Sequence, residues 1–274
     1  MKKRLIPLIL LALLLFATAC GAPEEASGPI EAVPLEDSAA AEPASDSDDA
    51  DTSAAEPAEE EPAEEEEMSA EEPAEEETAA EEEAAEEEAA EEAAAGELTI
   101  FTISQESSQA RFELDEDLAG ARITVVGTTD QVAGEIGVDF TNPANSQLGV
   151  IQVNARTFVT DNDFRNRAIQ NRILNTDTYE FITFTPAGIS GLPESVAVGD
   201  TINFSVAGDL TVRDVTSTAT FDVELTIVSE TEISGSAGTT IMRETYELQI
   251  PSVPNVANVE EEIELYIDFT ALAG

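Results

Sequence analysis

Apolar and polar residues alternate with a period of two along the chain from residue 202 to residue 227. Before a tight Arg-Asp turn, one face of an extended chain carries Ile202, Phe204, Val206, Gly208, Leu210 and Val212. After the turn, the same face carries Phe221, Val223, Leu225 and Ile227. Because successive side chains of a strand point to opposite faces, this pattern is typical of half-buried strands. It predicts an antiparallel β-hairpin whose two strands are joined by Asp214 and Val215.

Similar short alternating runs, separated by turn signals, extend from Leu98 to Leu272. They predict a strand over Ile233 to Ile250, a final strand over Ile263 to Leu272, and a turn over Glu116 to Gly120. The exception is Thr160 to Asn175, where Phe164, Ala168, Ile169 and Ile173 lie at helical spacing. We therefore predict that residues 97–274 form an all-β antiparallel barrel of about eight strands with one short helix.

The chain begins with a short basic region and an apolar run of about a dozen residues, which is typical of an export signal and too short to span a bilayer comfortably. Small residues then lead to Cys20, and this pattern resembles the lipobox of bacterial lipoproteins. The resemblance implies that residues 1–20 end in a cleaved signal peptide and that Cys20 carries acyl chains. We expect an exported protein, anchored through Cys20 to the outer face of a bacterial membrane.

Residues 21–96 consist mainly of Ala, Glu and Pro and contain almost nothing large and apolar. From residue 21 to residue 97 there are 32 acidic residues and no basic one. Such a segment cannot offset the entropy of ordering by burying side chains, so we predict a disordered linker. As a coil of roughly 77 residues it would reach about 50 Å, and charge repulsion would extend it further.

The whole chain has a formal net charge of −48, no His, no Trp and one cysteine. Nucleic acid is not expected as a partner, because binding it requires Lys and Arg to neutralise phosphates. Without imidazole and without a thiol beyond Cys20, the domain lacks the usual ligands for zinc, copper, haem or iron–sulfur clusters. Asp161 to Asp163 do not begin an EF-hand, since Arg165, Asn166 and Arg172 stand at positions that require other residues. We expect no metal, no cofactor and no catalysis.

Five ordered motifs resemble the YceI-like family. They are S-x-x-x-F at Ser108 to Phe112, G-x-I-x-x-D at Gly134 to Asp139, N-P-x-x-S at Asn142 to Ser146, T-x-N-x-x-R at Thr160 to Arg165, and G-x-L-T-x-R-x-V-T at Gly208 to Thr216. The resemblance covers nearly the whole domain. It implies a lipocalin-like barrel whose apolar lumen holds an isoprenoid or a similar amphipathic lipid.

Under that resemblance, the lumen would be lined by Ile202, Phe204, Val206, Leu210, Leu225, Ile227, Leu265, Ile267 and Phe269. An eight-stranded barrel can equally be filled by its own side chains, so a structural or adhesive surface domain without a ligand is the alternative. Arg165, Arg213 and Arg243 are candidates for contacts to a lipid headgroup, or else for ion pairs with the many carboxylates. A homodimer is compatible with the sequence.

Overall fold

The computed structural model describes residues 28–35 and 98–274 of the chain. The predicted signal peptide, Cys20 and most of the acidic segment lie outside these ranges. In the part of the chain that the structure describes, no helix is long and apolar enough to cross a membrane.

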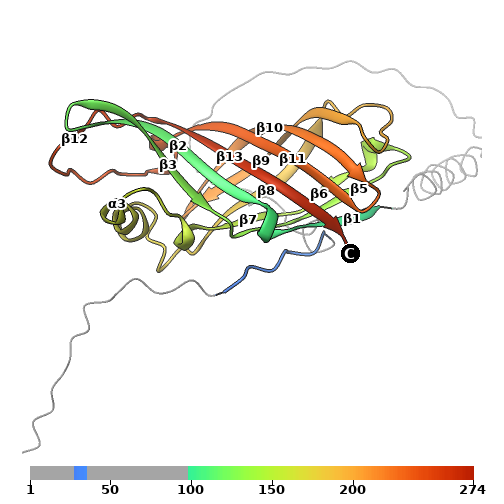
Figure 1. The fold of residues 1–274 in the computed structure, drawn as a ribbon, viewed down its shortest axis with the longest axis horizontal. Helices are drawn as coiled ribbons and strands as arrows, with labels where there is room; N and C mark the ends of the chain where they lie inside the picture. The colour runs from blue at the N-terminus through green and yellow to red at the C-terminus, as the bar shows by residue number, and fades with distance from the viewer. Residues whose placement is uncertain (1–27, 36–97) are drawn as a thin grey trace, which may run out of the picture.

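Antiparallel strands of residues 98–274 form one 13-stranded sheet that curls around an apolar interior (Figure 1). The strands are β1 Thr99–Ile103, β2 Gln109–Leu118, β3 Ala121–Thr129, β4 Val132–Ala133, β5 Glu135–Val138, β6 Gln147–Leu148, β7 Ile151–Asn154, β8 Phe181–Ser190, β9 Thr201–Val212, β10 Val215–Ser229, β11 Glu232–Met242, β12 Val256–Ala257 and β13 Glu262–Ala273. The predicted fold class is confirmed. The structure has 13 strands where about eight were predicted, and three of them, β4, β6 and β12, have only two residues each.

The hairpin predicted from the alternating pattern is formed by β9 and β10. Phe204 pairs with Val223, and Ile202 pairs with Leu225, so the apolar faces of both strands coincide. The turn, however, is one residue earlier than predicted, because Val212 pairs with Val215 and leaves Arg213 and Asp214 as the two loop residues. Arg213 has a φ of 60°, in the left-handed region that tight two-residue hairpin turns require.

Strand β13 organises the sheet because it pairs with three other strands. It pairs with β11 along almost its whole length, with β2 over its first half and with β1 at its C-terminal end. Strands β2 and β3 extend to Leu118 and Ala121, so the turn predicted over Glu116 to Gly120 is shorter than expected. Only Ala119 and Gly120 form it, and both have positive φ.

The strand predicted over Ile233 to Ile250 is also too long. Strand β11 ends at Met242, and a 3₁₀ turn, η5 Arg243–Tyr246, follows it. Burial explains the break: Ile233 and Ile241 are buried at odd positions, whereas Tyr246 and Leu248 are buried at even positions. A continuous strand cannot bury both sets on one face.

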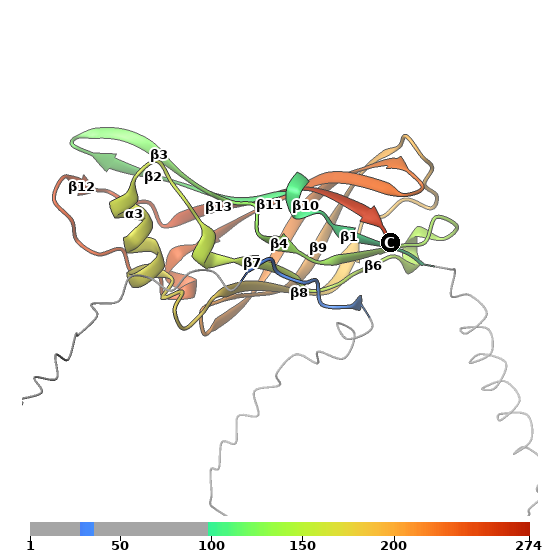
Figure 2. The same ribbon diagram turned by 60° about the horizontal axis from the view of Figure 1, so that its bottom comes forward.

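The predicted helix is confirmed as α3 Asp163–Ala168, which continues into a π-helical turn over Ile169–Ile173. The side chain of Asn162 caps α3 by accepting hydrogen bonds from the backbone N–H groups of Phe164 and Arg165. Helix α3 lies at the same end of the barrel as the β2–β3 turn and β12, while the C-terminus lies at the other end (Figures 1 and 2).

Residues 28–35 run along the outside of the sheet, drawn in blue in Figure 2. The backbone N–H of Leu35 donates to Oε2 of Glu135 at 2.9 Å, and the carbonyl of Ile30 accepts from Nε2 of Gln105 at 2.5 Å. These eight residues belong to the segment predicted to be disordered, and they contact the domain instead.

Candidate functional site

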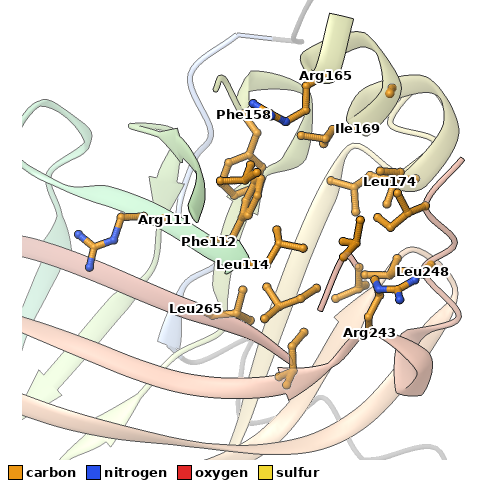
Figure 3. A pocket seen from close by; sticks show the side chains of 18 of the residues that line it. Arg111, Phe112, Leu114, Phe158, Arg165, Ile169, Leu174, Arg243, Leu248 and Leu265 are labelled. Carbon is orange, nitrogen blue, oxygen red and sulfur yellow. Dashed lines mark hydrogen bonds between the residues drawn. The ribbon is translucent and has the colours of Figure 1, made fainter. Parts of the chain in front are cut away.

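A cavity of about 380 Å³ lies inside the barrel at the end covered by α3. Its walls come from most of the sheet and from the helix. The apolar lining includes Phe112, Leu114, Val125, Ile151, Val153, Phe158, Ile169, Leu174, Ile182, Phe184, Leu210, Val212, Phe221, Ile241, Leu248, Ile263, Leu265 and Ile267. Figure 3 shows several of these side chains gathered around one space. The barrel is therefore hollow at this end, and the cavity is of a size that ligand sites commonly have.

Exposed apolar side chains mark the opening of the cavity. Phe164 on α3 is 78% exposed, Leu118 stands at the tip of β2, and Val253 lies in the segment before β12. All three belong to the lining. Apolar side chains therefore extend from the interior to the rim, and an apolar molecule can enter along them.

A second, smaller cavity of about 90 Å³ lies further along the same barrel. Of the nine residues predicted to line the lumen, Leu210 and Leu265 line the large cavity, and Ile202, Phe204, Val206, Leu225, Ile227 and Phe269 line the small one. Ile267, the ninth, lines both, as does Ile151. All nine side chains face the interior, but most of them belong to the smaller compartment.

Two glycines make room for aromatic rings of the large cavity. A Cβ on Gly127 would lie 2.2 Å from the ring of Phe112, and a Cβ on Gly208 would lie 2.7 Å from the ring of Phe184. The backbone of β8 is closer still to Gly208, since the carbonyl oxygen of Thr185 would be 2.4 Å from such a Cβ. Gly208, the first residue of the G-x-L-T-x-R-x-V-T motif, therefore allows β8 to approach closely because it has no side chain.

The two ring pairs built in this way are edge-to-face contacts. Phe112 meets Phe158 with ring centroids 5.3 Å apart, and Phe184 meets Phe221 at 4.9 Å. Such pairs fix ring orientation and add to the stability gained from burial alone. Two edge-to-face ring pairs therefore form the aromatic side of the cavity.

Arg165 lies on the helix side of the cavity (Figure 3). Its Nη2 is 2.9 Å from Oε1 of Glu116, a carboxylate on β2 that is itself 7% exposed. Its Nη1 pairs with Asp161. The guanidinium therefore joins α3 to β2 at the lining and has two carboxylate partners.

Arg243 also lines the cavity, whereas Arg213 does not. Arg243 pairs with Glu261 and donates from Nη1 to the carbonyl of Leu248 at 3.0 Å, which fixes the segment after β11. Arg213 donates from Nη1 to the carbonyl of Ile173 at 3.2 Å and so connects the β9–β10 turn to the helical segment. All three predicted arginines thus make contacts within the protein.

Sequence reasoning missed much of the lining of the large cavity. The missed positions on β2, Ala110, Phe112, Leu114, Glu116 and Leu118, do alternate along the chain. The turn predicted over Glu116 to Gly120 interrupted this alternation, so Glu116 and Leu118 were not expected on the strand. The helical contribution of Ile169 and Leu174 could not be assigned to the cavity from spacing alone, because spacing does not say which end of the barrel a helix covers.

The lining offers few groups for chemistry. Its ionisable side chains are Arg111, Glu116, Arg165, Arg243 and Tyr266. Arg111 stacks over the ring of Tyr266 at 4.5 Å and pairs with Glu113. The hydroxyl of Tyr266 donates to Oε2 of Glu264, and this hydrogen bond is the main reason that the pKa of Tyr266 is raised. Among the described residues, no group of three or more His, Cys, Asp or Glu could hold a metal ion.

The fold and the cavity define an antiparallel β-barrel with an apolar interior that opens at one end. The YceI-like domain matches residues 101–271, and the chain belongs to this family. UPF0312 protein SAS2572 of Staphylococcus aureus (strain MSSA476) is 29% identical over 159 residues, which are 54% of this chain and 82% of that protein.

Solved structures resemble the domain at low sequence identity. A polyisoprenoid binding domain from Saccharophagus degradans, implicated in plant cell wall breakdown, superposes with a TM-score of 0.51 at 16% identity. The match covers 65% of this chain and 99% of that domain. Burkholderia cenocepacia BcnA gives a TM-score of 0.49 at 14% identity, over 61% of this chain and 98% of BcnA.

Proposed function

We propose that the domain binds an isoprenoid-type lipid, such as a quinone or a polyprenyl chain, in the large cavity and carries or sequesters it in the cell envelope. The observation that carries this proposal is the apolar cavity of about 380 Å³ with an apolar rim. A slender, branched hydrocarbon chain would bury its surface against aliphatic and aromatic walls, which is the main source of affinity for such ligands. The polyisoprenoid binding domain of the same fold supports this choice of ligand.

The charges at the lining favour a neutral headgroup over a diphosphate. Arg165 already has Glu116 and Asp161 as partners, and Arg243 has Glu261. A diphosphate would have to displace these carboxylates or lie beside them, and like charges at short distance are unfavourable. A quinone or an alcohol could instead accept or donate hydrogen bonds at the mouth without this repulsion.

We propose binding without a reaction. The one carboxylate of the lining, Glu116, is paired with Arg165, and the chain has no histidine to act as a base near neutral pH. The alternative of a filled adhesive barrel is less favoured because of the cavity. Export and anchoring through Cys20 remain part of the proposal and rest on the sequence alone.

The test is to purify the protein from membranes, extract it with organic solvent and analyse the extract by mass spectrometry. We expect an isoprenoid-type lipid to co-purify. Adding polyprenol or quinone to the extracted protein should raise its melting temperature, since ligand at 100 times its Kd stabilises a protein by about 2.7 kcal/mol. Polyprenyl diphosphate of the same chain length should raise it less.

Ala168→Trp provides a variant that fills the cavity from α3, and Ala197→Trp is its matched control on an exposed segment away from the lining. We expect Ala168→Trp to weaken lipid binding about tenfold, which corresponds to about 1.4 kcal/mol. The control should bind as the wild type does. If no apolar molecule co-purifies and no added lipid binds, the carrier function is wrong.

A further inference from the structure

The acidic segment contains its large aliphatic residues at one place only. Between residue 21 and residue 96, the only Ile, Val and Leu residues are Ile30, Val33 and Leu35, and the one other large apolar residue is Met68. A spacer that only separates two points needs none of them. Three of the six positions from 30 to 35 are therefore large and aliphatic, so this stretch differs from the rest of the segment.

The structure places these positions against the domain. Leu35 is 9% exposed, and its N–H donates to the carboxylate of Glu135 on β5. Gln105, which follows β1, donates from its side chain to the carbonyl of Ile30. Two hydrogen bonds and one buried side chain thus hold Ile30 at the 3₁₀ turn after β1 and Leu35 at β5.

The surface beneath Leu35 is an unusual outer face. On β1 the inward residues are Phe101 and Ile103, so Ile100, and Leu98 before it, face outward. A Cβ on Gly137 would lie 3.4 Å from the side chains of both Ile100 and Leu98, and 3.6 Å from Leu35. The three side chains therefore gather above a position with no side chain, and Leu35 covers two aliphatic residues that would otherwise face water.

We propose that the outer face of β1 and β5 is an interaction surface whose occupant is the chain's own segment 28–35. Pro29 and Pro34 restrict the backbone of this segment before it docks, which lowers the entropy lost on docking. We name the segment the clip. It divides the acidic segment into seven residues before Gly28 and a longer stretch after Leu35.

The clip sets the reach of the domain, a consequence that also rests on the proposed anchor at Cys20. Cys20 and Gly28 are eight residues apart, so with the clip docked they can be separated by at most about 29 Å, whatever the conformation between them. With the clip released, the full linker would reach about 50 Å or more. Docking therefore holds the cavity near the membrane that would supply an apolar lipid, and release would extend it away.

The first test measures hydrogen exchange of the Leu35 amide by NMR in the full mature chain. The amide of Met68 serves as the internal reference for the same segment. We expect the Leu35 amide to exchange at least about tenfold more slowly than its sequence-corrected unprotected rate, because its hydrogen bond must open first. Exchange of Leu35 at the unprotected rate would overturn the proposal, whether or not the domain binds lipid.

Substitutions on both sides of the contact make the test specific. Leu35→Asp should abolish the protection, and Met68→Asp, which adds the same charge to the same segment, should leave it unchanged. Glu135→Ala should reduce the protection, while Glu135→Gln keeps an acceptor oxygen and should retain it. If the amide of residue 35 is equally protected in Leu35→Asp and in the wild type, the contact does not involve the leucine side chain and the proposal fails.

A second measurement uses the single thiol. In chain 20–274 without acylation, a nitroxide attached to Cys20 should broaden the amide signals near Gln105 and Glu135 in the wild type and in Met68→Asp, but not in Leu35→Asp. A mixed sample distinguishes contact within one chain from contact between chains. In it, copies that carry the nitroxide have no ¹⁵N, and copies that carry ¹⁵N have no nitroxide. Broadening of the ¹⁵N-labelled copies in the mixed sample, as strong as in the fully spin-labelled sample, would assign the surface to a second copy and refute docking within the single chain.

Discussion

Asp139 accepts three hydrogen bonds from the loop that follows β5, and it is 1% exposed. Its Oδ1 accepts from the N–H groups of Thr141 and Asn142 at 2.8 Å, and its Oδ2 accepts from Nδ2 of Asn145 at 3.1 Å. The hydrogen bond from the backbone of Asn142 is the largest cause of the lowered pKa of Asp139, followed by the one from Asn145. Asp139, the last residue of the G-x-I-x-x-D motif, therefore holds the loop that contains the N-P-x-x-S motif.

We predict that Asp139→Asn lowers the melting temperature by several degrees near neutral pH. The Asn side chain has one acceptor oxygen and one NH₂ group, and the NH₂ group cannot accept the hydrogen bonds that the loop donates to the carboxylate. Because the pKa of Asp139 is lower in the folded protein than its ordinary value of 3.8, its ionised carboxylate stabilises the fold at pH values above 3.8. This stabilisation is lost as the pH falls through the folded-state pKa. The difference between wild type and variant should therefore shrink on acidification. Thermal unfolding at several pH values measures it, with the exposed Asp130→Asn as control; a constant difference would contradict the assignment.

The structural reason for a glycine at position 208 could not be predicted from its motif. The sequence identified Gly208 by its place in G-x-L-T-x-R-x-V-T, but the reason for a glycine is the approach of Thr185 and Phe184 from the neighbouring strand. That approach involves a register shift in β8 between Pro186 and Gly188. No spacing in the sequence could indicate it, because it arises only when the two strands pair.

At the scale of elements, alternation predicted which faces turn inward but not where strands end. The β9 and β10 faces are as expected, since Val206, Leu210, Val223 and Leu225 are all buried. The end of β11 was missed although the burial phase changes between Ile241 and Tyr246, a signal that was readable in the sequence. The division of the lumen into two cavities was not readable, because it depends on how side chains from different strands meet.

The division of the lumen into two cavities gives a prediction about the length of the prenyl chain that binds, and this prediction rests on the proposed lipid ligand. Ile151 and Ile267 line both cavities and so stand between them. Ile267→Ala should join the two spaces and shift the preference toward longer prenyl chains, at a cost of about 2 kcal/mol in stability. The rise in melting temperature with polyprenols of increasing length measures the preference.

The matched control is Ile202→Ala, which enlarges the small cavity without removing a side chain shared by both. It should rank the polyprenols as the wild type does. Ile267→Val, which removes one methyl group, should give an intermediate preference with less loss of stability. If Ile267→Ala and Ile267→Val rank chain lengths as the wild type does, Ile267 does not limit the depth of the site.

For the whole molecule, the sequence separated an acidic segment from a barrel, and the barrel is confirmed. What composition could not show is that the two parts touch. Averaged over 76 residues, the segment from 21 to 96 is nearly free of large apolar side chains, yet Leu35 is buried against the domain. A contact of this kind depends on an apolar outer face at Leu98 and Ile100, which alternation alone treats as solvent-facing.

The remaining prediction at this scale concerns the anchor, which lies outside the described residues. Two or more acyl chains on Cys20 would hold the protein stably on a membrane, whereas one chain gives only marginal binding. Cys20→Ser should therefore move the protein from the membrane fraction to the soluble fraction, as measured by sedimentation after cell lysis. Thr18→Ser, which keeps a small residue before the cysteine, should remain with the membranes. Sedimentation of Cys20→Ser with the membranes would show that another part of the chain attaches it, and the short reach inferred for the docked clip would then have no fixed origin.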